Sequence, residues 1–132
     1  MISKLLTLLK LKEQETNKFL GRHVILDIWG TENSEVFLDI SAASKVLKEI
    51  AINAGATVLD ERWHHFGEGN GYTGVIILAE SHISVHTWPE YGHAAVDIFM
   101  CGEPDPRTTV KPIVSYFKAN KYSILISQRG QM

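Results

Sequence analysis

The chain has 132 residues, which is enough for one domain and too few for two of ordinary size. Apolar residues make up 45% and charged residues 21%, as in a typical globular protein. The 13 basic and 15 acidic residues leave a net charge of -2 with no long basic run, which argues against nucleic acid or an anionic membrane as a partner.

Residues 1–20 are expected to form an N-terminal amphipathic helical extension, followed by a single domain over residues 21–132. Apolar residues in the extension recur at helical spacing, at Ile2, Leu5, Leu6 and Leu9. Charged residues interrupt this segment too early for a signal peptide, and no stretch of the chain is long enough to span a bilayer. The helix is expected to cover the domain or a partner subunit.

The domain itself begins with a β-type pattern. Runs of β-branched and aromatic residues predict six strands, over residues 22–29, 57–66, 75–79, 81–87, 93–101 and 122–127. The third run is apolar throughout, which predicts a strand buried on both faces. A glycine-rich segment over residues 67–71 predicts a flexible turn before it.

Two helices interrupt the strands. The first is predicted around residues 43–54, with Ser41 as its N-cap and Gly55 as its stop. The second follows Pro104 and Pro106 and carries apolar residues at helical spacing, at Val110, Ile113, Val114 and Phe117. This order predicts an α+β fold, a two-layer sandwich of a mainly antiparallel sheet with helices packed on one face. The uncovered face favours homodimerisation.

Three residues in one short stretch have side chains that could take part in catalysis. Ser81 is a latent nucleophile, His86 an imidazole and Cys101 the only thiol, which excludes an internal disulfide and favours a reducing compartment such as the cytoplasm. Each of them taken alone is more often structural than catalytic. In a flat strand Ser81 and His86 project to opposite faces, because side chains alternate and their separation is odd.

Other kinds of site remain possible from the residues alone. A zinc site could draw its ligands from six positions, His64, His65, His82, His86, His93 and Cys101. The sequence has no HExxH arrangement, and the region around His82 favours a strand, so we expect no metal. A cysteine hydrolase with Cys101 as nucleophile lacks a recognisable signature, and no phosphate-binding or dinucleotide-binding loop is present.

Several short runs of residues, taken together, favour a catalytic role for Ser81, His86 and Cys101 over a purely structural one. They are Gly21-Arg22-His23, Thr73 to Ile77, Ala79-Glu80-Ser81-His82, His86-Thr87-Trp88-Pro89-Glu90, Ala95-Val96-Asp97 and Cys101-Gly102. In order and spacing they resemble the prokaryotic, short-chain, pyruvoyl-dependent S-adenosylmethionine decarboxylases. The resemblance extends from Gly21 to the C-terminus and is densest over residues 71–102.

The resemblance implies a chain that cuts itself between Glu80 and Ser81, into a β chain of residues 1–80 and an α chain of residues 81–132. Ser81 would become a pyruvoyl group, the only cofactor, which forms a Schiff base with the substrate amine and accepts electrons as pyridoxal phosphate does in other enzymes. His86 would be the proton acceptor in processing, Thr73 a supporting hydroxyl and Cys101 the proton donor in decarboxylation. No metal and no pyridoxal phosphate are implied.

The substrate implied is S-adenosylmethionine, decarboxylated to the aminopropyl donor of spermidine synthesis by a homodimer of cleaved protomers. Trp63 and Phe66 are pocket candidates, since an aromatic ring suits adenine or a sulfonium. Residues 67–70 depart from the usual family linker, and Glu68 in that loop could pair with the cationic side chain of arginine or ornithine, substrates of related enzymes. An uncleaved regulatory homologue is a further alternative, which the presence of Ser81, His86 and Cys101 together disfavours.

Overall fold

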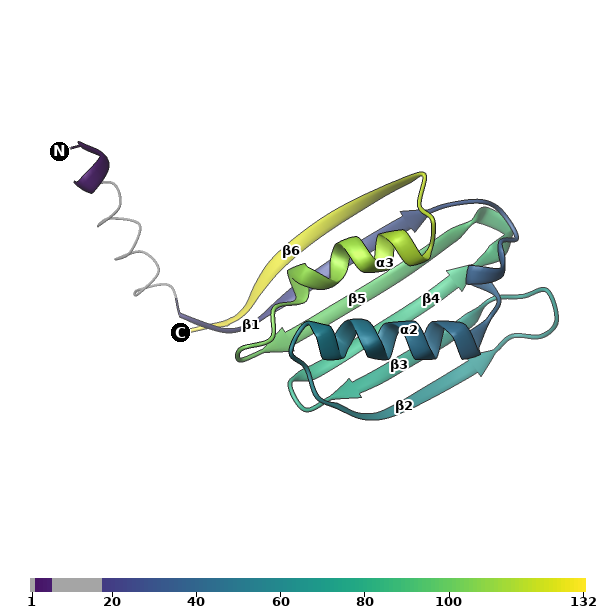
Figure 1. Cartoon of the computed structure of the whole chain (residues 1–132), viewed down its shortest axis with the longest axis horizontal. Helices are drawn as coiled ribbons and strands as arrows, with labels where there is room; N and C mark the ends of the chain where they lie inside the picture. The colour runs from purple at the N-terminus through teal and green to yellow at the C-terminus, as the bar shows by residue number, and fades with distance from the viewer. Residues whose placement is uncertain (1, 6–17) are drawn as a thin grey trace.

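The computed structural model describes residues 2–5 and 18–132. The body is a six-stranded sheet in the order β2-β3-β4-β5-β1-β6, and each neighbouring pair is antiparallel. Two helices lie side by side on one face of this sheet (Figure 1). The expected α+β two-layer architecture is confirmed.

All six predicted strands are present, and most are longer than their apolar residues indicated. Their bounds are β1 (Phe19–Trp29), β2 (Val58–His65), β3 (Tyr72–Leu78), β4 (Ser81–Trp88), β5 (His93–Cys101) and β6 (Lys121–Gln131). Backbone pairing carries β1 and β6 beyond their apolar centres. Gly21, for example, pairs with Cys101 on one side and with Arg129 on the other.

The two helices are α2 (Ile40–Asn53) and α3 (Val110–Tyr116). The predicted N-cap at Ser41 is wrong, because the helix begins at Ile40 and the side chain of Asp39 accepts a hydrogen bond from the backbone N–H of Ala42 at 3.1 Å. The predicted stop is confirmed, since Gly55 follows the last turn with a φ of +94°.

The hydrophobic core lies between the helices and the sheet. Alternate strand residues point into it, so the prediction that the third strand is buried on both faces is wrong: Ile76 is buried, whereas its neighbour Ile77 is 42% exposed. No described element covers the second face of the sheet. Further buried residues include Val24, Leu26, Leu47, Ile83, Val85, Val96, Ile98, Ile113 and Phe117.

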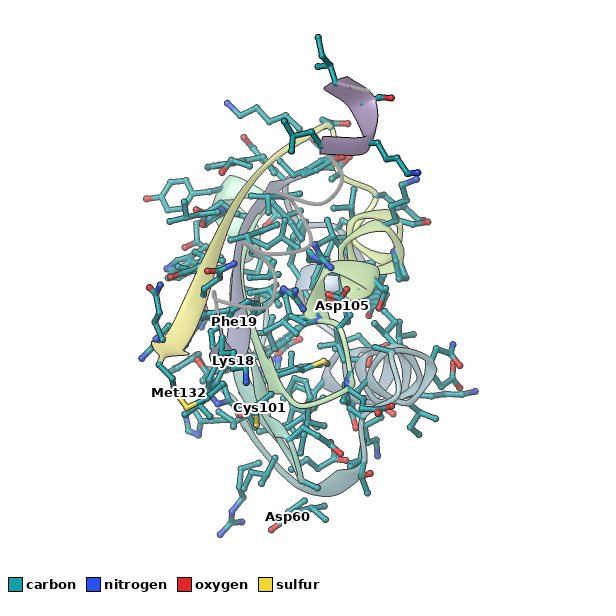
Figure 2. The ribbon with its side chains drawn as sticks, turned by 90° about the vertical axis from the view of Figure 1, so that its left-hand side faces the viewer. Lys18, Phe19, Asp60, Cys101, Asp105 and Met132 are labelled. Atoms are coloured by element: carbon teal, nitrogen blue, oxygen red, sulfur yellow. The ribbon has the colours of Figure 1, made fainter. Side chains whose placement is uncertain are left out.

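We call that second face the open face. Figure 2 shows side chains, and none of the helices over residues 18–132, on the side of the sheet away from α2 and α3. Its residues alternate with the buried ones along the four central strands. They are Thr73, Val75 and Ile77 of β3, His82, Ser84, His86 and Trp88 of β4, His93, Ala95, Asp97 and Phe99 of β5, and His23, Ile25, Asp27 and Trp29 of β1.

A carboxylate ties α2 to the edge strand β2. Glu61 accepts hydrogen bonds from Ser44 and from the indole N–H of Trp63, and the Nζ of Lys48 lies 2.6 Å from its Oε2. The hydrogen bond from Lys48 is the largest of the effects that hold the pKa of Glu61 below its ordinary value.

The N-terminal extension is described only in part. Residues 2–5 are helical, and β1 already begins at Phe19, inside the range expected for the extension. The rest of the predicted helix, over residues 6–17, lies outside the described residues. Within the described part of the chain, no helix is long and apolar enough to cross a membrane.

Candidate active site

Ser81 is the first residue of β4, directly after the short turn that leads from β3. Its φ of 152° lies in a region that residues with a Cβ rarely adopt, at a cost of about 1–3 kcal/mol. The turn is held from outside, because the backbone N–H of Ala79 donates to the carbonyl oxygen of Thr57 at 2.9 Å. The fold therefore imposes strain on the residue that follows the expected cut.

The carbonyl oxygen of Glu80 receives two hydrogen bonds from one residue. The backbone N–H of Cys101 donates to it at 3.0 Å and the Cys101 thiol at 2.8 Å. The same thiol lies 3.7 Å from the Ser81 hydroxyl oxygen. Two donors aimed at one carbonyl oxygen can stabilise the negative charge that develops there when a nucleophile attacks the carbonyl carbon.

Gly21 allows this cluster to form. It pairs with Cys101 across β1 and β5, and a Cβ at this position would lie 2.8 Å from the Met100 carbonyl oxygen and 3.1 Å from the Cβ of Cys101. Only a residue without a side chain fits that approach. Cys101 lies at the end of the sheet where β1 begins and β6 ends, near Phe19 in Figure 2.

The side chain of Glu80 is fixed as well. One carboxylate oxygen accepts from the backbone N–H of Thr57 at 2.9 Å, and the other lies 3.4 Å from the Thr57 hydroxyl oxygen. Both sides of the Glu80–Ser81 peptide bond are thus held, by Thr57 on one side and by Cys101 on the other. Sequence patterns gave no signal for Thr57, because it meets Glu80 only through the pairing of β2 with β3.

Thr73 and His86 form a second cluster. They are register partners on β3 and β4, and the Thr73 hydroxyl oxygen lies 2.9 Å from Nδ1 of His86. Both side chains belong to the open face. A hydroxyl held against an imidazole nitrogen can relay a proton to or from a bound molecule.

The two clusters do not meet within one chain. Ser81 and His86 are five residues apart on the same strand, a distance of roughly 16 Å at about 3.3 Å per residue. β4 runs straight from one to the other in register with β5, from Ser81 opposite Met100 to His86 opposite Ala95. The sequence resemblance implies that Ser81 and His86 act in one active site. Within a single protomer they are too far apart to do so.

A groove lies beside the second cluster. It encloses about 330 Å³ and is lined by Phe66, Asn70, Gly71, Thr73, His86, Thr87, Trp88 and Glu90. Phe66 and Trp88 supply exposed aromatic surface and Glu90 an exposed carboxylate. In the sequence, Trp88 and Glu90 stand out only as members of a motif, and their place at the groove follows from the turn after β4.

The three residues predicted to line the substrate pocket lie in different places. Phe66 lines the groove, whereas the Trp63 ring packs against Tyr72 in the helix-covered layer, with ring centroids 5.7 Å apart. A Cβ on Gly74 would lie 2.2 Å from the Trp63 ring, so this glycine provides the space for it. Glu68 is exposed in the turn after β2 and is not among the residues that line the groove.

Polar side chains also cross the middle of the open face. Nε2 of His23 lies 3.0 Å from a carboxylate oxygen of Asp97, and the hydroxyl of Ser84 donates to the other oxygen at 3.4 Å. Despite the histidines on this face, the described residues include no group of three or more His, Cys, Asp or Glu side chains arranged to hold a metal ion.

Comparisons with known proteins agree with the resemblance seen in the sequence. The family model described as S-adenosylmethionine decarboxylase matches residues 22–130. An S-adenosylmethionine decarboxylase proenzyme of Methanococcus aeolicus is 43% identical over 117 residues, which cover 87% of this chain and 97% of the relative. The proenzyme of Thermosipho melanesiensis is 37% identical over 115 residues, or 86% of this chain and 87% of the relative.

A solved structure extends the similarity to the fold. The crystal structure of the adenosylmethionine decarboxylase from Aquifex aeolicus matches with a TM-score of 0.77 and 31% identity, covering 86% of this chain and 92% of that one. The region that the family model matches includes the strained serine, the thiol and the Thr73–His86 pair. The chain belongs to the S-adenosylmethionine decarboxylase family.

Proposed function

We propose that this chain is a proenzyme that cuts itself between Glu80 and Ser81 and then decarboxylates S-adenosylmethionine, providing the aminopropyl donor for spermidine synthesis. The observation that carries the proposal is the state of the Glu80–Ser81 bond. Its carbonyl oxygen receives two hydrogen bonds from Cys101, and its serine has a strained φ of 152°. Membership of the family supports the interpretation of this geometry as a self-cleavage site.

Self-cleavage begins with attack of the Ser81 hydroxyl on the Glu80 carbonyl carbon, which converts the amide to an ester. The two Cys101 donors stabilise the oxyanion of that step. Relief of the strained φ favours the same direction. Removal of the Ser81 Cα proton then expels the Glu80 carboxylate and leaves a dehydroalanine at position 81. Water hydrolyses the imine tautomer of that residue, which releases ammonia and leaves a pyruvoyl group on the α chain, residues 81–132.

The proton transfers of this sequence need a base, and the Thr73–His86 pair is roughly 16 Å from Ser81 in the same chain. We therefore propose a homodimer in which the open faces of two copies meet. An antiparallel arrangement places Thr73 and His86 of one copy against Ser81 and Cys101 of the other. The expectation of a dimer, which an uncovered sheet face already favours, thereby gains a chemical reason.

The groove is the proposed binding site for the adenosyl part of the substrate. The exposed rings of Phe66 and Trp88 suit stacking on adenine, and the Glu90 carboxylate can accept hydrogen bonds from ribose hydroxyls. In the dimer this groove opens toward the partner's residue 81. Trp63 and Glu68, both proposed from the sequence, would act only indirectly, Trp63 by shaping the sheet beneath the groove and Glu68 from the exposed turn after β2.

Cys101 is the proposed proton donor in decarboxylation. A pyruvoyl group at position 81 supplies the electron sink for loss of carbon dioxide. The Cys101 thiol lies 3.7 Å from the Ser81 oxygen, which supports its role as the proton donor to the substrate Cα. Because this role requires a free thiol, we propose that the enzyme acts in a reducing compartment, the cytoplasm.

Two measurements test the proposal. Intact mass of the purified protein should show fragments of residues 1–80 and 81–132, and Ser81→Ala should leave one inactive chain. Release of carbon dioxide from S-adenosylmethionine, arginine and ornithine, assayed side by side, should favour S-adenosylmethionine. A full-length chain that persists, or activity that survives Ser81→Ala, would overturn self-cleavage; preference for another amino acid would overturn the substrate.

A further inference from the structure

Four neighbouring strands contribute one row of stacked side chains to the open face. Lys121, Trp29, His93 and Trp88 are successive register partners across β6, β1, β5 and β4. The rings of Trp29 and His93 are stacked with centroids 4.9 Å apart, and those of His93 and Trp88 with centroids 5.3 Å apart. The ammonium group of Lys121 lies 4.9 Å from the Trp29 ring and closes the row at its outer end.

The row ends in the groove, because Trp88 is one of the lining residues and is 39% exposed. One face of its indole is covered by His93, which leaves the remaining surface to the groove. A tryptophan on a strand that is partly exposed has other rotamers available to it. The stack on His93 selects one of them.

The ring of His93 is itself held in place through its Nδ1 nitrogen. Its Nδ1 lies 2.9 Å from the Ile28 carbonyl oxygen, which can only accept, so Nδ1 carries the proton. Its Nε2 faces a carboxylate oxygen of Asp27 at 3.6 Å. The hydrogen bond to the Ile28 carbonyl oxygen fixes the rotation of the imidazole, which an isolated stack would leave free.

We propose that Trp29 and His93 are positioning residues that hold the Trp88 indole as a preformed wall of the groove and so strengthen binding of the adenine ring. This inference rests on the proposed function, in which the groove receives the adenosyl group. Neither residue touches the reacting atoms at Ser81. In variants that still form the proposed dimer, loss of the stack should therefore weaken substrate binding and leave the chemical step unchanged.

The first experiment compares His93→Ala with His93→Phe in steady-state release of carbon dioxide from S-adenosylmethionine. His93→Ala should raise KM by about 3- to 10-fold with kcat within about 2-fold, the range that loss of an aromatic pair implies. His93→Phe, which keeps a flat ring in the stack but loses the hydrogen bond to Ile28, should bring KM back most of the way to the wild-type value. Tyr122→Ala is the matched control, an exposed aromatic on β6 whose register partner is Ile28 rather than a member of the row.

The second experiment observes the Trp88 ring directly. The chain has 3 tryptophans, so Trp29→Phe with Trp63→Phe leaves Trp88 as the only tryptophan and keeps a ring in the stack. Adding His93→Ala should increase quenching of Trp88 fluorescence by acrylamide, and adding His93→Phe should leave it unchanged. Acrylamide quenching requires no turnover, so it can also be measured in a variant that binds substrate poorly.

The outcomes separate this inference from the proposed function. Failure of wild-type protein to release carbon dioxide from S-adenosylmethionine would remove the proposed function. If the wild type is active, an unchanged KM in His93→Ala, a fall in kcat alone, or a His93→Phe variant as impaired as His93→Ala would each overturn the positioning role. Acrylamide quenching of Trp88 that does not respond to His93→Ala would overturn it as well.

Discussion

Cys101 meets the Glu80 carbonyl oxygen through two different groups, a backbone N–H at 3.0 Å and a thiol at 2.8 Å. Substitution of the side chain removes only the second donor. The thiol therefore serves the two proposed steps unequally: it is one of two donors in self-cleavage and the only proton donor in decarboxylation. The contribution of the thiol to self-cleavage and its contribution to decarboxylation can therefore be measured separately.

We predict that Cys101→Ala slows self-cleavage by at most about 10²-fold, the lower end of the effect of removing one oxyanion donor, because the backbone donor remains. Cys101→Ser, which keeps an O–H, should be cut at a rate closer to that of the wild type. Both variants should lose most of their decarboxylation. Mass spectrometry follows the cut and trapped carbon dioxide follows turnover. A cleaved Cys101→Ala variant with wild-type turnover would show that another group protonates the substrate.

Gly74 shows how a single atom controls the packing of two strands. It faces Trp63 across β2 and β3, and an added Cβ would lie 2.2 Å from the indole. We predict that Gly74→Ala lowers the free energy of unfolding by about 2–3 kcal/mol, the upper range of overpacking. Urea unfolding at a fixed protein concentration, in a Ser81→Ala chain that stays in one piece, measures this. Trp63→Leu should recover part of the loss, and an unchanged midpoint would contradict the packing.

At the scale of elements, Glu61 links α2 to β2 with a pKa lowered chiefly by the hydrogen bond from Lys48. A carboxyl group whose pKa is lower in the folded state stabilises the fold above its unfolded pKa of about 4.3 and ceases to do so as the pH falls through the folded value. Both side chains are about one third exposed, with side-chain accessibilities of 36% for Lys48 and 28% for Glu61, which limits the effect.

We therefore predict that Glu61→Gln, again in the Ser81→Ala chain, lowers the free energy of unfolding at pH 7 by about 1 kcal/mol or less. The difference between the two chains should shrink as the pH is lowered below about 4. Urea titrations at several pH values give both numbers. A difference that stays constant down to about pH 3 would mean that the charge of Glu61 has no part in joining the helix to the strand.

Local patterns in the sequence predicted each strand and helix, because alternation and helical spacing reflect which side of an element is buried. These patterns gave a wrong prediction where the burial of a residue depends on whether another layer of the fold covers it. The run from Val75 to Ala79 is apolar on both sides, yet only one side of β3 is buried, since no described element covers Ile77. The cap at Asp39 was missed because Ser41 offers the same chemistry two residues later.

The residues of the candidate site could be proposed from the sequence, and its geometry only in part. Ser81, His86 and Cys101 followed from the resemblance, and the expectation that Ser81 and His86 do not meet on a flat strand followed from strand alternation. The positions of Thr57 beside Glu80 and of Trp88 at the groove depend on strand pairing and on a turn, which no spacing in the sequence encodes. The strained φ of Ser81 likewise follows from tertiary structure.

At the scale of the whole molecule, the proposed function leaves one protomer with two incomplete halves of a site. The strained bond and the thiol lie at one end of the sheet, and the Thr73–His86 pair with its groove lies roughly 16 Å away on the open face. The proposed dimer, which joins the open faces, would complete two sites at once. It also covers the face that the described elements leave exposed.

This account predicts that the two halves can be supplied by different chains. Ser81→Ala keeps His86 but has no serine to convert, and His86→Ala keeps Ser81 and Cys101 but lacks the base. Expressed alone, each variant should remain largely uncut. In a mixed dimer, one site combines Ser81 and Cys101 of one chain with Thr73 and His86 of the other.

The most direct measurement is co-expression of Ser81→Ala and His86→Ala under two different affinity tags, followed by purification of the mixed dimer and intact mass spectrometry. We predict that the His86→Ala chain is cut at Glu80–Ser81 in the mixed dimer and that decarboxylation returns to about half of the wild-type value per dimer, one site of two. A mixed dimer that forms but leaves the His86→Ala chain uncut would contradict the shared active site.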